Sequence, residues 1–500
     1  MIKKFTKTDK QFGIALLVGL AIRLFAILFS MPNEADAVSR IFIAQRWMAN
    51  PELISSGVWG PLHTYLIAAI LYIWNDAVYA PVFLNCLFSA AVAIPLYFFV
   101  KREWNNETAA LFVACLYLAY PVAIRYGLVA MTEVPYNFFI ALALLALSYA
   151  RGENGNWKHA LLAGLIVTIA GSLRYEAWGL IPFLGLLLWK QWREMLVFFV
   201  ASSIFPVFWM VGNYLEFGDP LYSFTWSLNW VLIIGLQNEG VTTIDLINRL
   251  IYFPRALFFG LTPLALLVCA VGIILVLYHR SRQWIWLMPF VILFLTYTMN
   301  AVSGKLTTQI RYSMNLAIFI IPFAAEWFIR QKDARRLLLS AIVVGSMLPL
   351  SYVRYVIPWP FDFPHPVPEQ VSLIPQVEQS SVRISEYQIQ QSKKYSGGLL
   401  LDFYAWGETY YIALMSRKHP SSIFIMPGEV NQSLDMNELN IFIKDNPTGI
   451  VLLTDDPRFM QIEQTANGAQ LRITGYDKTL SIEVIGESEG SRFYRYTVNP

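Results

Sequence analysis

The chain has 500 residues, of which 56% are hydrophobic and only 14% are charged. Soluble proteins carry about 25% charged residues, so this composition excludes an ordinary soluble domain and indicates a membrane as the main solvent. The formal net charge of +3 is spread over many loops, which argues against a nucleic-acid-binding surface.

Apolar runs of membrane-spanning length recur from the N-terminus into the last third of the chain. The first run, residues 12–30, has no small-residue cleavage site after it, so it is not interpreted as a signal peptide. Because a hydrocarbon core takes about 20 apolar residues, the pattern predicts an α-helical polytopic membrane protein. About eleven transmembrane helices are expected, near residues 12–30, 80–100, 108–122, 134–150, 159–173, 176–190, 195–213, 254–278, 284–300, 312–329 and 337–355.

The apolar piece at residues 62–74 is too short to cross, because about thirteen residues rise only about 20 Å in a helix. It is predicted to be an interfacial or re-entrant helix in an outer loop, residues 31–79, that carries juxtamembrane helices. Excluding it places about sixteen Lys and Arg on one side of the membrane and about eight on the other. The positive-inside rule then predicts a cytoplasmic N-terminus, a transmembrane domain over residues 1–358 and a C-terminal tail on the outer face.

The tail, residues 359–500, is predicted to be a small soluble α/β domain. It follows a Pro-rich stalk, IPWPFDFPHPVP. The segments GGLLLDF, SIFIMP and TGIVLLTD have the composition of short buried strands, and WGETYYIALMSRK and LDMNELNIFIKDN between them have helical spacing. This alternation predicts a parallel sheet, which a β-rich segment from residue 469 closes.

Ionisable residues gather at the outer ends of the predicted spans, where burial near hydrocarbon is costly and tends to mark function. Four places on the outer face hold them: Glu34, Asp36, Arg40 and His63; Arg125 and Glu133; Arg174 and Glu176; and Lys305 and Arg311. The side of the membrane on which each loop lies was assigned only from the basic residues of the cytoplasmic loops. All four places nevertheless fall on the outer face, which predicts a single outward-facing polar cavity.

The inventory of such a cavity indicates its chemistry. Carboxylates can act as a general base on an acceptor hydroxyl, and arginines suit phosphate oxygens and stay charged when partly buried. The sequence has no P-loop, no Rossmann glycine motif and no His/Cys metal spacing, and Cys86, Cys115 and Cys269 lie in apolar runs. A soluble nucleotide donor is not normally available on the outer face, so the pattern indicates a phosphate anchored in the bilayer, as in a polyprenyl-phosphate sugar.

The motifs around these residues resemble the GT-C class of membrane glycosyltransferases, in particular the branch of protein O-mannosyltransferases and the bacterial aminoarabinose transferase of lipid A. DAVSRIFIAQRW is similar to the D-E-A-x-x-x-x-I-A helix of that branch, with Asp36 at the acidic position. WGPLHTYL corresponds to its (K/H)-P-P-L segment, and MTEVPYNFF, with Glu133, corresponds to its second acidic outer loop. SLRYEAWGLIPFLGLLL and RYSMNLAIFIIP, which hold Arg174 and Arg311, correspond to its L-T-(K/R) and late R-(Y/F) helices.

Three departures from the family pattern affect this comparison. Ala37 stands where the family often has a second carboxylate, so Glu34 would have to supply it. Gly60 and Pro61 replace the Pro pair, and His63 lies beyond them. The β-trefoil insertion of the eukaryotic mannosyltransferases is absent, which suggests a prokaryotic enzyme of the cytoplasmic membrane.

The resemblance implies an inverting hexosyl- or pentosyltransferase with a polyprenyl-phosphate sugar as donor. Its site candidates are the carboxylates Asp36, Glu34 and Glu133 for catalysis, and Arg311, Arg174, Arg125, His63 and Lys305 for the carrier phosphate. Beyond the lipid-linked donor, either no cofactor or a divalent cation is expected, and the three carboxylates are the ligand candidates for such a cation.

Simpler structural roles compete for these residues. Asp36 is a good N-cap for the helix that follows it, and Glu133 could likewise cap a helix. Arg174 and Glu176 could form a local ion pair that closes a tight hairpin, and Arg311 could snorkel to the membrane interface.

Other functions compete as well. Transfer of a whole oligosaccharide to protein is an alternative, but the sequence lacks a W-W-D-Y-G motif. A polytopic transporter or flippase would be expected to have inverted halves with Gly/Pro-broken helices in matching positions, and no such symmetry is visible. Which sugar is moved, and whether a protein, a lipid or a glycan accepts it, stays open.

Overall fold

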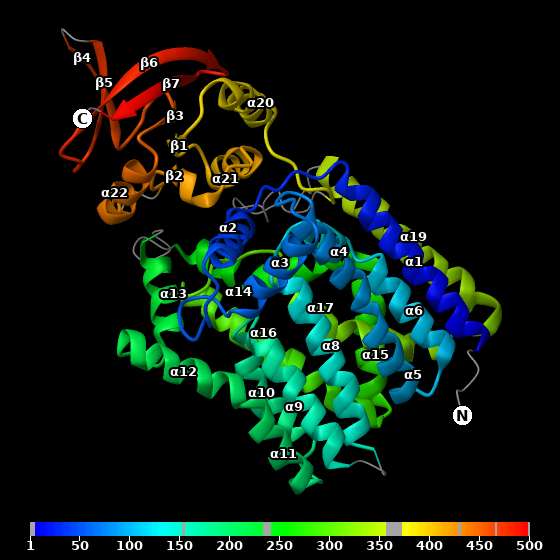
Figure 1. Ribbon diagram of the computed structural model, residues 1–500. Helices are drawn as coiled ribbons and strands as arrows, with labels where there is room; N and C mark the ends of the chain where they lie inside the picture. Colours follow the sequence, from blue (N-terminus) through cyan, green and yellow to red (C-terminus); the bar gives the residue numbers. More distant parts are fainter. Residues whose placement is uncertain are drawn as a thin grey trace. The chain divides into compact units, whose positions relative to one another are not determined.

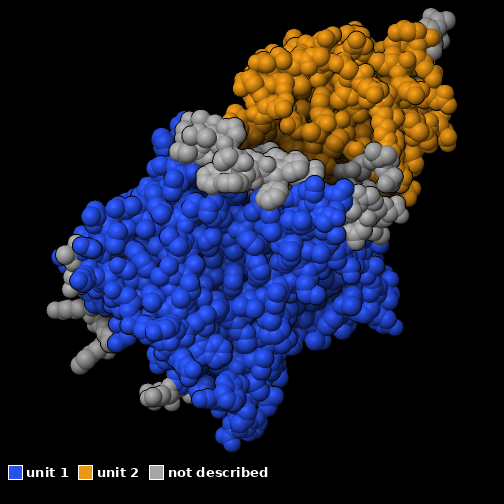
Figure 2. Space-filling view, turned by 180° about the vertical axis from the view of Figure 1, so that it is seen from behind, with its two compact units in different colours: residues 1–29, 53–63, 82–374 blue, residues 30–52, 64–81, 375–500 orange. Residues whose placement is uncertain are grey.

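The computed structural model describes residues 6–152, 156–233, 242–356, 373–428, 432–465 and 468–498. The chain divides into two compact units, which Figure 2 shows in blue and orange. Unit 1 comprises Met1–Phe29, Leu53–His63 and Val82–Ile374, and unit 2 comprises Ser30–Glu52, Thr64–Pro81 and Pro375–Pro500. The predicted domain boundary at residues 358 and 359 and the Pro-rich stalk both lie outside the described residues.

Helices make up the described chain as far as residue 356 (Figure 1). In the first half they are α1 (Lys7–Ile27), α2 (Ala35–Ala49), α3 (Leu62–Ile73), α4 (Ala80–Ala91), α5 (Ala93–Glu103), α6 (Glu107–Leu118), α7 (Pro121–Gly127), α8 (Glu133–Ala150) and α9 (Trp157–Gly171). They continue as α10 (Glu176–Leu186), α11 (Trp192–Ser202), α12 (Ile204–Phe217), α13 (Tyr222–Ile233), α14 (Thr243–Leu261), α15 (Pro263–Tyr278), α16 (Met288–Val302), α17 (Tyr312–Ile320), α18 (Ala324–Arg330) and α19 (Asp333–Val356). The 3₁₀ segments η1 (Arg282–Leu287) and η2 (Ile321–Phe323) precede α16 and α18.

Six helical stretches in the described ranges are long and apolar enough to cross a membrane, and four of them join consecutive labelled segments, such as α4 and α5 in Ala80–Glu103. The number is eight if each of two bent pairs counts as one span. Helices α9 and α10 are apolar but shorter. The structure therefore confirms several membrane-length helices, but it does not confirm the predicted number of about eleven spans. Helix α3 has 12 residues, which rise about 18 Å, so it matches the short helix expected at residues 62–74.

Two predicted spans are bent rather than straight. The span predicted at residues 254–278 is wrong as one helix, because α14 and α15 meet at an angle of 113°. Thr262 lies between them with φ 73° and ψ 150°, which is not helical, and Pro263 follows it. A residue before proline is disfavoured in the α region, which explains the break. Helices α6 and α7 likewise bend by 55°, and Pro121 starts α7.

The break between α6 and α7 is stabilised by buried polar side chains of α1 and α4. Arg23 is fully buried, and its Nη1 donates to the carbonyl of Leu118 at 3.0 Å and to that of Gly19 at 2.9 Å. Its Nε donates to Oγ of Ser89 at 2.8 Å, and that hydroxyl donates to the carbonyl of Ala123 at 2.6 Å. Irregular backbone at membrane depth is tolerated only where such partners satisfy it.

Helix α4 provides two more donors for the segment that leads into α8. Asn85 is buried, and its Nδ2 donates to the carbonyls of Val129 and Met131, the latter at 3.0 Å. The Cys86 thiol donates to the carbonyl of Gly127 at 3.2 Å. The turn just before α8 is therefore held in place by side chains that are distant in sequence.

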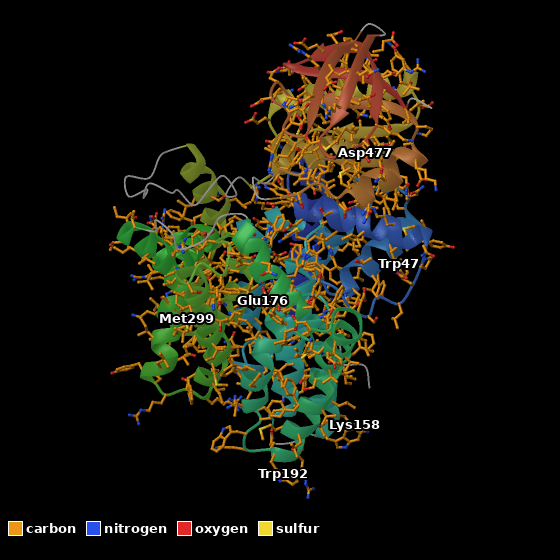
Figure 3. The ribbon with its side chains drawn as sticks, turned by 90° about the vertical axis from the view of Figure 1, so that its left-hand side faces the viewer. Trp47, Lys158, Glu176, Trp192, Met299 and Asp477 are labelled. Atoms are coloured by element: carbon orange, nitrogen blue, oxygen red, sulfur yellow. The ribbon has the colours of Figure 1, made fainter. Side chains whose placement is uncertain are left out.

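Helix α17 lies in the interior of unit 1 (Figure 1). All nine of its residues are buried, and it packs against α8, α14 and α16. Lys158 and Trp192 lie at the same end of unit 1, and Glu176 lies away from that end (Figure 3). The basic loops at Lys158 and Trp192 thus share one end, as the charge count predicts, and which side of the membrane this end faces stays a prediction.

Unit 2 contains one seven-stranded sheet with the strand order β2-β1-β3-β7-β6-β5-β4. The strands are β1 (Gly398–Leu401), β2 (Ile423–Ile425), β3 (Thr448–Leu453), β4 (Met460–Thr465), β5 (Gly468–Ile473), β6 (Thr479–Ser488) and β7 (Ser491–Val498), and the helices of this part are α20 (Gln379–Lys394), α21 (Trp406–Met415) and α22 (Met436–Asp445), with the 3₁₀ turn η3 (Pro420–Ser422). Strands β2, β1 and β3 pair in parallel, and the other four form an antiparallel meander joined to β3 through β7.

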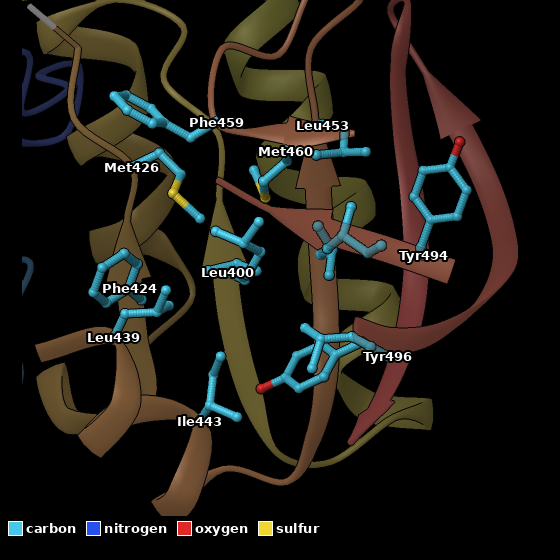
Figure 4. Close-up of a cluster of buried hydrophobic side chains, with 14 of the residues drawn as sticks. Leu400, Phe424, Met426, Leu439, Ile443, Leu453, Phe459, Met460, Tyr494 and Tyr496 are labelled. Carbon is cyan, nitrogen blue, oxygen red and sulfur yellow. The ribbon is translucent and has the colours of Figure 1, made fainter. Parts of the chain in front are cut away.

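The core of this sheet consists of apolar side chains from both its parallel and its antiparallel parts (Figure 4). Leu400 and Leu453 from the parallel strands share it with Tyr496 from β7 and with Leu439 and Ile443 from α22. The three predicted strands and the two helices between them are therefore present. The β-rich segment extends the same sheet and pairs antiparallel, so only part of the sheet is parallel.

The polar contacts that hold the turn before α8 generate a stability prediction. We expect Asn85→Leu, which keeps the side-chain size, to lower the free energy of unfolding by about 1–3 kcal/mol because it leaves buried carbonyls unsatisfied. Thermal unfolding in detergent would measure this change. Asn300→Leu, on a half-buried position of α16, is the matched control and should have little effect; equal stability of the two variants would contradict the role of Asn85.

Candidate active site

Three helices of unit 1 begin at one cluster of charged side chains. Glu133 is the first residue of α8, Glu176 is the first residue of α10, and Arg311 directly precedes α17. A carboxylate in the first turn of a helix is favoured by the partial positive charge of that end. The two carboxylates are thus favoured locally at their helix starts, whereas Arg311 is stabilised at the start of α17 by its pairing with Glu133. Packing of the three helices brings the starts together.

The cluster is centred on the carboxylate of Glu133, which is completely buried. Its Oε1 is 2.6 Å from Nη1 of Arg174 and 3.2 Å from Nε of Arg311. Arg174 also donates from Nε and Nη2 to Oε1 of Glu176, at 3.0 and 2.6 Å. Two arginines and two glutamates therefore form one network, in which the formal charges of these four side chains balance.

Neutral polar side chains continue this network into the helix bundle. Tyr297 of α16 donates its hydroxyl proton to Oε1 of Glu176 at 3.0 Å. Asn315 of α17 donates to the Tyr297 oxygen at 2.9 Å, and Asn137 of α8 donates to Oδ1 of Asn315 at 3.0 Å. A continuous chain of hydrogen bonds therefore links α8, α10, α16 and α17 inside unit 1.

An aromatic ring lies against both arginines. The guanidinium carbon of Arg174 is 5.4 Å from the ring centre of Tyr312, and that of Arg311 is 5.7 Å from it. At these distances a ring attracts a cation through its quadrupole. Tyr312 therefore contributes to holding two like charges next to the single oxygen of Glu133.

The WGPLH segment packs against the hinge that carries Arg174. The amide of Leu62 donates to the carbonyl of Ser172 at 3.4 Å, and the hydroxyl of Tyr175 donates to the carbonyl of Val58 at 2.7 Å. A Cβ on Gly60 would lie 2.2 Å from the Ser172 oxygen. Only glycine allows this close approach, which gives a physical reason for the departure from the Pro pair at this position.

The other phosphate-binding candidates of unit 1 lie in different surroundings. His63 is 2% exposed at the start of α3, and Arg125 is 3% exposed in α7. Lys305 is exposed in the loop before α17. Of the predicted site residues, the structure brings Glu133, Arg174 and Arg311 together in one cluster.

Asp36 and Glu34 belong to unit 2, where α2 packs against α21. A Cβ on Gly407, in the WGETYY segment, would lie 2.7 Å from the carbonyl oxygen of Asn33, so this glycine allows the start of α2 to approach α21 closely. Tyr410 of α21 is hydrogen-bonded to Ser39, and burial and the nearby Asp36 charge raise the pKa of this tyrosine. The C-terminal segment thus positions the helix that carries Asp36.

The structure agrees with the simpler structural roles of these residues only in part. Glu34, and not Asp36, occupies the N-cap position of α2, and Asp36 is the second residue of the helix. Arg174 and Glu176 do form the predicted ion pair, but Arg174 also binds Glu133. Arg311 is only 6% exposed and paired with Glu133, which corrects the interpretation that it snorkels to the interface.

Three residues of the network, Tyr297, Asn137 and Asn315, are not among the site residues predicted from the sequence. Asn137 lies four residues after Glu133 and Asn315 lies four residues after Arg311, so each is one turn further into an apolar helix on the same face. That spacing is the feature of the sequence that could have identified the two asparagines. No such feature marks Tyr297, because tyrosines are abundant throughout this sequence.

Three carboxylates, Glu34, Asp36 and Glu133, are the metal-ligand candidates predicted from the sequence. Within the described residues, no three His, Cys, Asp or Glu side chains gather as a group that could hold a metal ion. Glu133 belongs to unit 1, whereas Glu34 and Asp36 belong to unit 2. The set of Glu34, Asp36 and Glu133 as metal ligands therefore stays a prediction, as does the single polar cavity.

Comparison with known proteins agrees with this architecture. A family model described as dolichyl-phosphate-mannose-protein mannosyltransferase matches residues 58–214, which include Glu133 and Arg174. The structure of ArnT from Cupriavidus metallidurans bound to undecaprenyl phosphate is similar with a TM-score of 0.67 and 11% identity, over 96% of this chain and 97% of that chain. The apo state of ArnT gives a TM-score of 0.61 at 12% identity over the same shares.

A more distant likeness is to the oligosaccharyltransferase AglB from Archaeoglobus fulgidus, in complex with an inhibitory peptide and a dolichol-phosphate. Its TM-score is 0.51 at 10% identity, over 89% of this chain and 70% of that chain. No curated protein sequence matches the chain.

The structural similarity to ArnT and AglB shows that the chain has the fold of a GT-C-class, multi-pass integral membrane protein. Within that class it resembles the branch of protein mannosyltransferases and the aminoarabinose transferase, as the motifs predict.

The shared oxygen of Glu133 generates the second prediction. We expect Glu133→Gln to lower the free energy of unfolding by about 3–5 kcal/mol, because two buried guanidiniums lose their common counter-charge. Glu438→Gln is the matched control, since Glu438 pairs with Arg46 at 3.4 Å with both side chains more than half exposed; such pairs contribute at most about 1 kcal/mol. Thermal or denaturant unfolding in detergent would measure both, and similar losses in the two variants would show that burial of the cluster is unimportant.

Proposed function

We propose that this chain is an inverting glycosyltransferase that moves a sugar from a polyprenyl-phosphate carrier to an acceptor hydroxyl on the outer face of a prokaryotic cytoplasmic membrane. The observation that carries the proposal is the convergence of Arg174 and Arg311 on one buried carboxylate oxygen of Glu133. A likeness in fold along almost the whole chain to a protein bound to undecaprenyl phosphate supports it.

In this proposal the arginine pair holds the phosphate of the donor. Guanidinium groups bind phosphate oxygens through parallel hydrogen bonds and remain charged in a poorly solvated site. When the bond between the anomeric carbon and the phosphate oxygen breaks, negative charge grows on the leaving polyprenyl phosphate. Positive charge that is already in place next to that oxygen stabilises the transition state without reorganisation.

Glu133 is proposed to act through these arginines rather than on the sugar. The carboxylate is completely buried and binds both guanidiniums through one oxygen, so it determines where they point before the donor arrives. Tyr312 and Glu176 support the same arrangement. The role of Glu133 as a catalytic carboxylate, which the family resemblance implies, is thus proposed to be a positioning role.

Asp36 is proposed as the general base. It would accept the proton of the acceptor hydroxyl as the acceptor oxygen attacks the anomeric carbon from the side opposite the phosphate, which inverts the configuration. Its place in the first turn of α2, on a helix held against α21, supports a defined orientation. Glu34 is the second carboxylate of the proposal, and Arg125, His63 and Lys305 are secondary candidates for the carrier phosphate.

The third prediction tests these two roles separately. With purified protein in detergent, radiolabelled polyprenyl-phosphate sugars and membrane extracts as acceptors, we expect Asp36→Asn to lower kcat by about 10²–10⁴ while donor binding is unchanged. Arg311→Ala should weaken binding of polyprenyl phosphate by about 10- to 100-fold, because charged hydrogen bonds to phosphate are lost.

Matched controls separate these effects from general damage. Asp477→Asn makes the same chemical change in an exposed turn of unit 2, and Arg472→Ala removes an exposed arginine; both should behave as wild type. Full activity of Asp36→Asn, or no transfer from any polyprenyl-phosphate sugar, would exclude the mechanism. Transfer of a whole oligosaccharide to protein would favour the oligosaccharyltransferase alternative, and lipid movement without transfer would favour a flippase.

A further inference from the structure

Unit 2 has a cavity that the proposed reaction does not use. It lies where the chain leaves the carboxyl ends of β1 and β2, and it has a volume of about 120 Å³. In open α/β sheets, ligands bind outside the carboxyl ends of the parallel strands. Phe424 and Met426, which also belong to the core of the sheet (Figure 4), are among the lining residues.

One wall of the cavity is aromatic. The Phe403 and Trp406 rings meet edge to face with their centres 5.1 Å apart, and the Trp406 and Tyr410 rings stack with centres 6.1 Å apart and planes only 19° apart. Trp406 and Tyr410 are four residues apart on α21, so they share one helix face. Trp406 is 36% exposed, which makes an aromatic surface accessible at the cavity.

Polar and acidic side chains also line the cavity: Gln432, Asp435 and Glu438, with no lysine or arginine among the described lining residues. Oδ1 of Asp435 accepts from the backbone amides of Asn437 and Glu438, and Glu438 pairs with Arg46 at 3.4 Å. Within the described residues, the buried Oε1 of Gln432 has no hydrogen-bond partner. Carboxylate and amide oxygens accept hydrogen bonds from hydroxyl groups, and no cationic side chain is among the described lining residues to bind a phosphate. Aromatic rings and hydroxyl acceptors in one cavity match a molecule with one apolar C–H face and a rim of hydroxyls, which describes a neutral sugar ring.

The size of the cavity agrees with this ligand. A single water needs about 10–15 Å³ of such space, so 120 Å³ has room for several waters, comparable to one pyranose ring. We propose that this cavity binds a neutral sugar residue of the acceptor, so that the acceptor is a glycan or glycolipid rather than a protein hydroxyl. That the bound sugar belongs to an acceptor rests on the proposed function, whereas that the cavity binds a neutral sugar rests on the cavity alone.

Tyr410 links the cavity to the proposed base within unit 2. It lines the cavity and is hydrogen-bonded to Ser39 of α2. Ser39 and Asp36 are three residues apart and lie on the same face of that helix. A sugar bound against Trp406 and Tyr410 would thus be held on the helix pair that carries Asp36, which is where an acceptor needs to be presented.

The test is a binding measurement that needs no turnover. Full-length protein in lipid nanodiscs, without any maltoside detergent that would itself supply a sugar, is titrated with methyl glycosides of glucose, galactose, mannose and N-acetylglucosamine by saturation-transfer NMR. We expect at least one glycoside to bind and Trp406→Ala to weaken it by about three- to tenfold, the contribution of one stacked ring. Trp406→Phe, which keeps a ring, should retain most of the binding even if the alanine variant misfolds.

Trp157→Ala is the matched control, because Trp157 is 52% exposed and belongs to unit 1, whereas the cavity belongs to unit 2; it should bind as wild type. In the transfer assay, Trp406→Ala should raise the acceptor KM and leave kcat and the donor KM unchanged. Binding that depends on Trp406 without any transfer would support the sugar site and refute the proposed transferase. Transfer without glycoside binding, an acceptor KM unaffected by Trp406→Ala, or binding of a short peptide in place of the glycosides would overturn the sugar site.

Discussion

Two buried guanidiniums that share one carboxylate oxygen are the constraint on which the candidate site depends. A charge inside a membrane protein is costly unless it is paired, and Glu133 provides the counter-charge for both Arg174 and Arg311. The starts of α8 and α17 and the hinge before α10 must therefore stay within a few ångströms of each other. The hydrogen bonds through Tyr297 and Asn315 extend this requirement deeper into the bundle.

The chain contains a second constraint of a different kind at the break between α6 and α7. The carbonyls at this break accept from Arg23 on α1 and Ser89 on α4, and Asn85 on α4 donates to the turn that follows α7. The segment they hold leads directly into Glu133, so the position of the central carboxylate depends on donors far from it. The charged side chain of Arg23 in the apolar helix α1 is thus explained by the backbone carbonyls to which it donates.

In unit 2 the helix of Asp36 and the C-terminal segment form one body. Gly407 allows α2 to lie against α21, and Tyr410 joins the two helices through Ser39. The same tyrosine lines the proposed sugar cavity. The C-terminal segment therefore takes part both in positioning the proposed base and in the proposed recognition of the acceptor.

The sequence by itself determined the membrane character, most helix positions, the three parallel strands and the candidates Glu133, Arg174 and Arg311, because these follow from local hydrophobicity and from charge at span ends. Only the tertiary structure decided that these three share one oxygen, that Thr262 breaks a predicted span sharply, and that Asp36 belongs with the C-terminal segment. Those features depend on contacts between residues far apart in the chain. Periodicity and composition carry no information about which distant helix starts will meet.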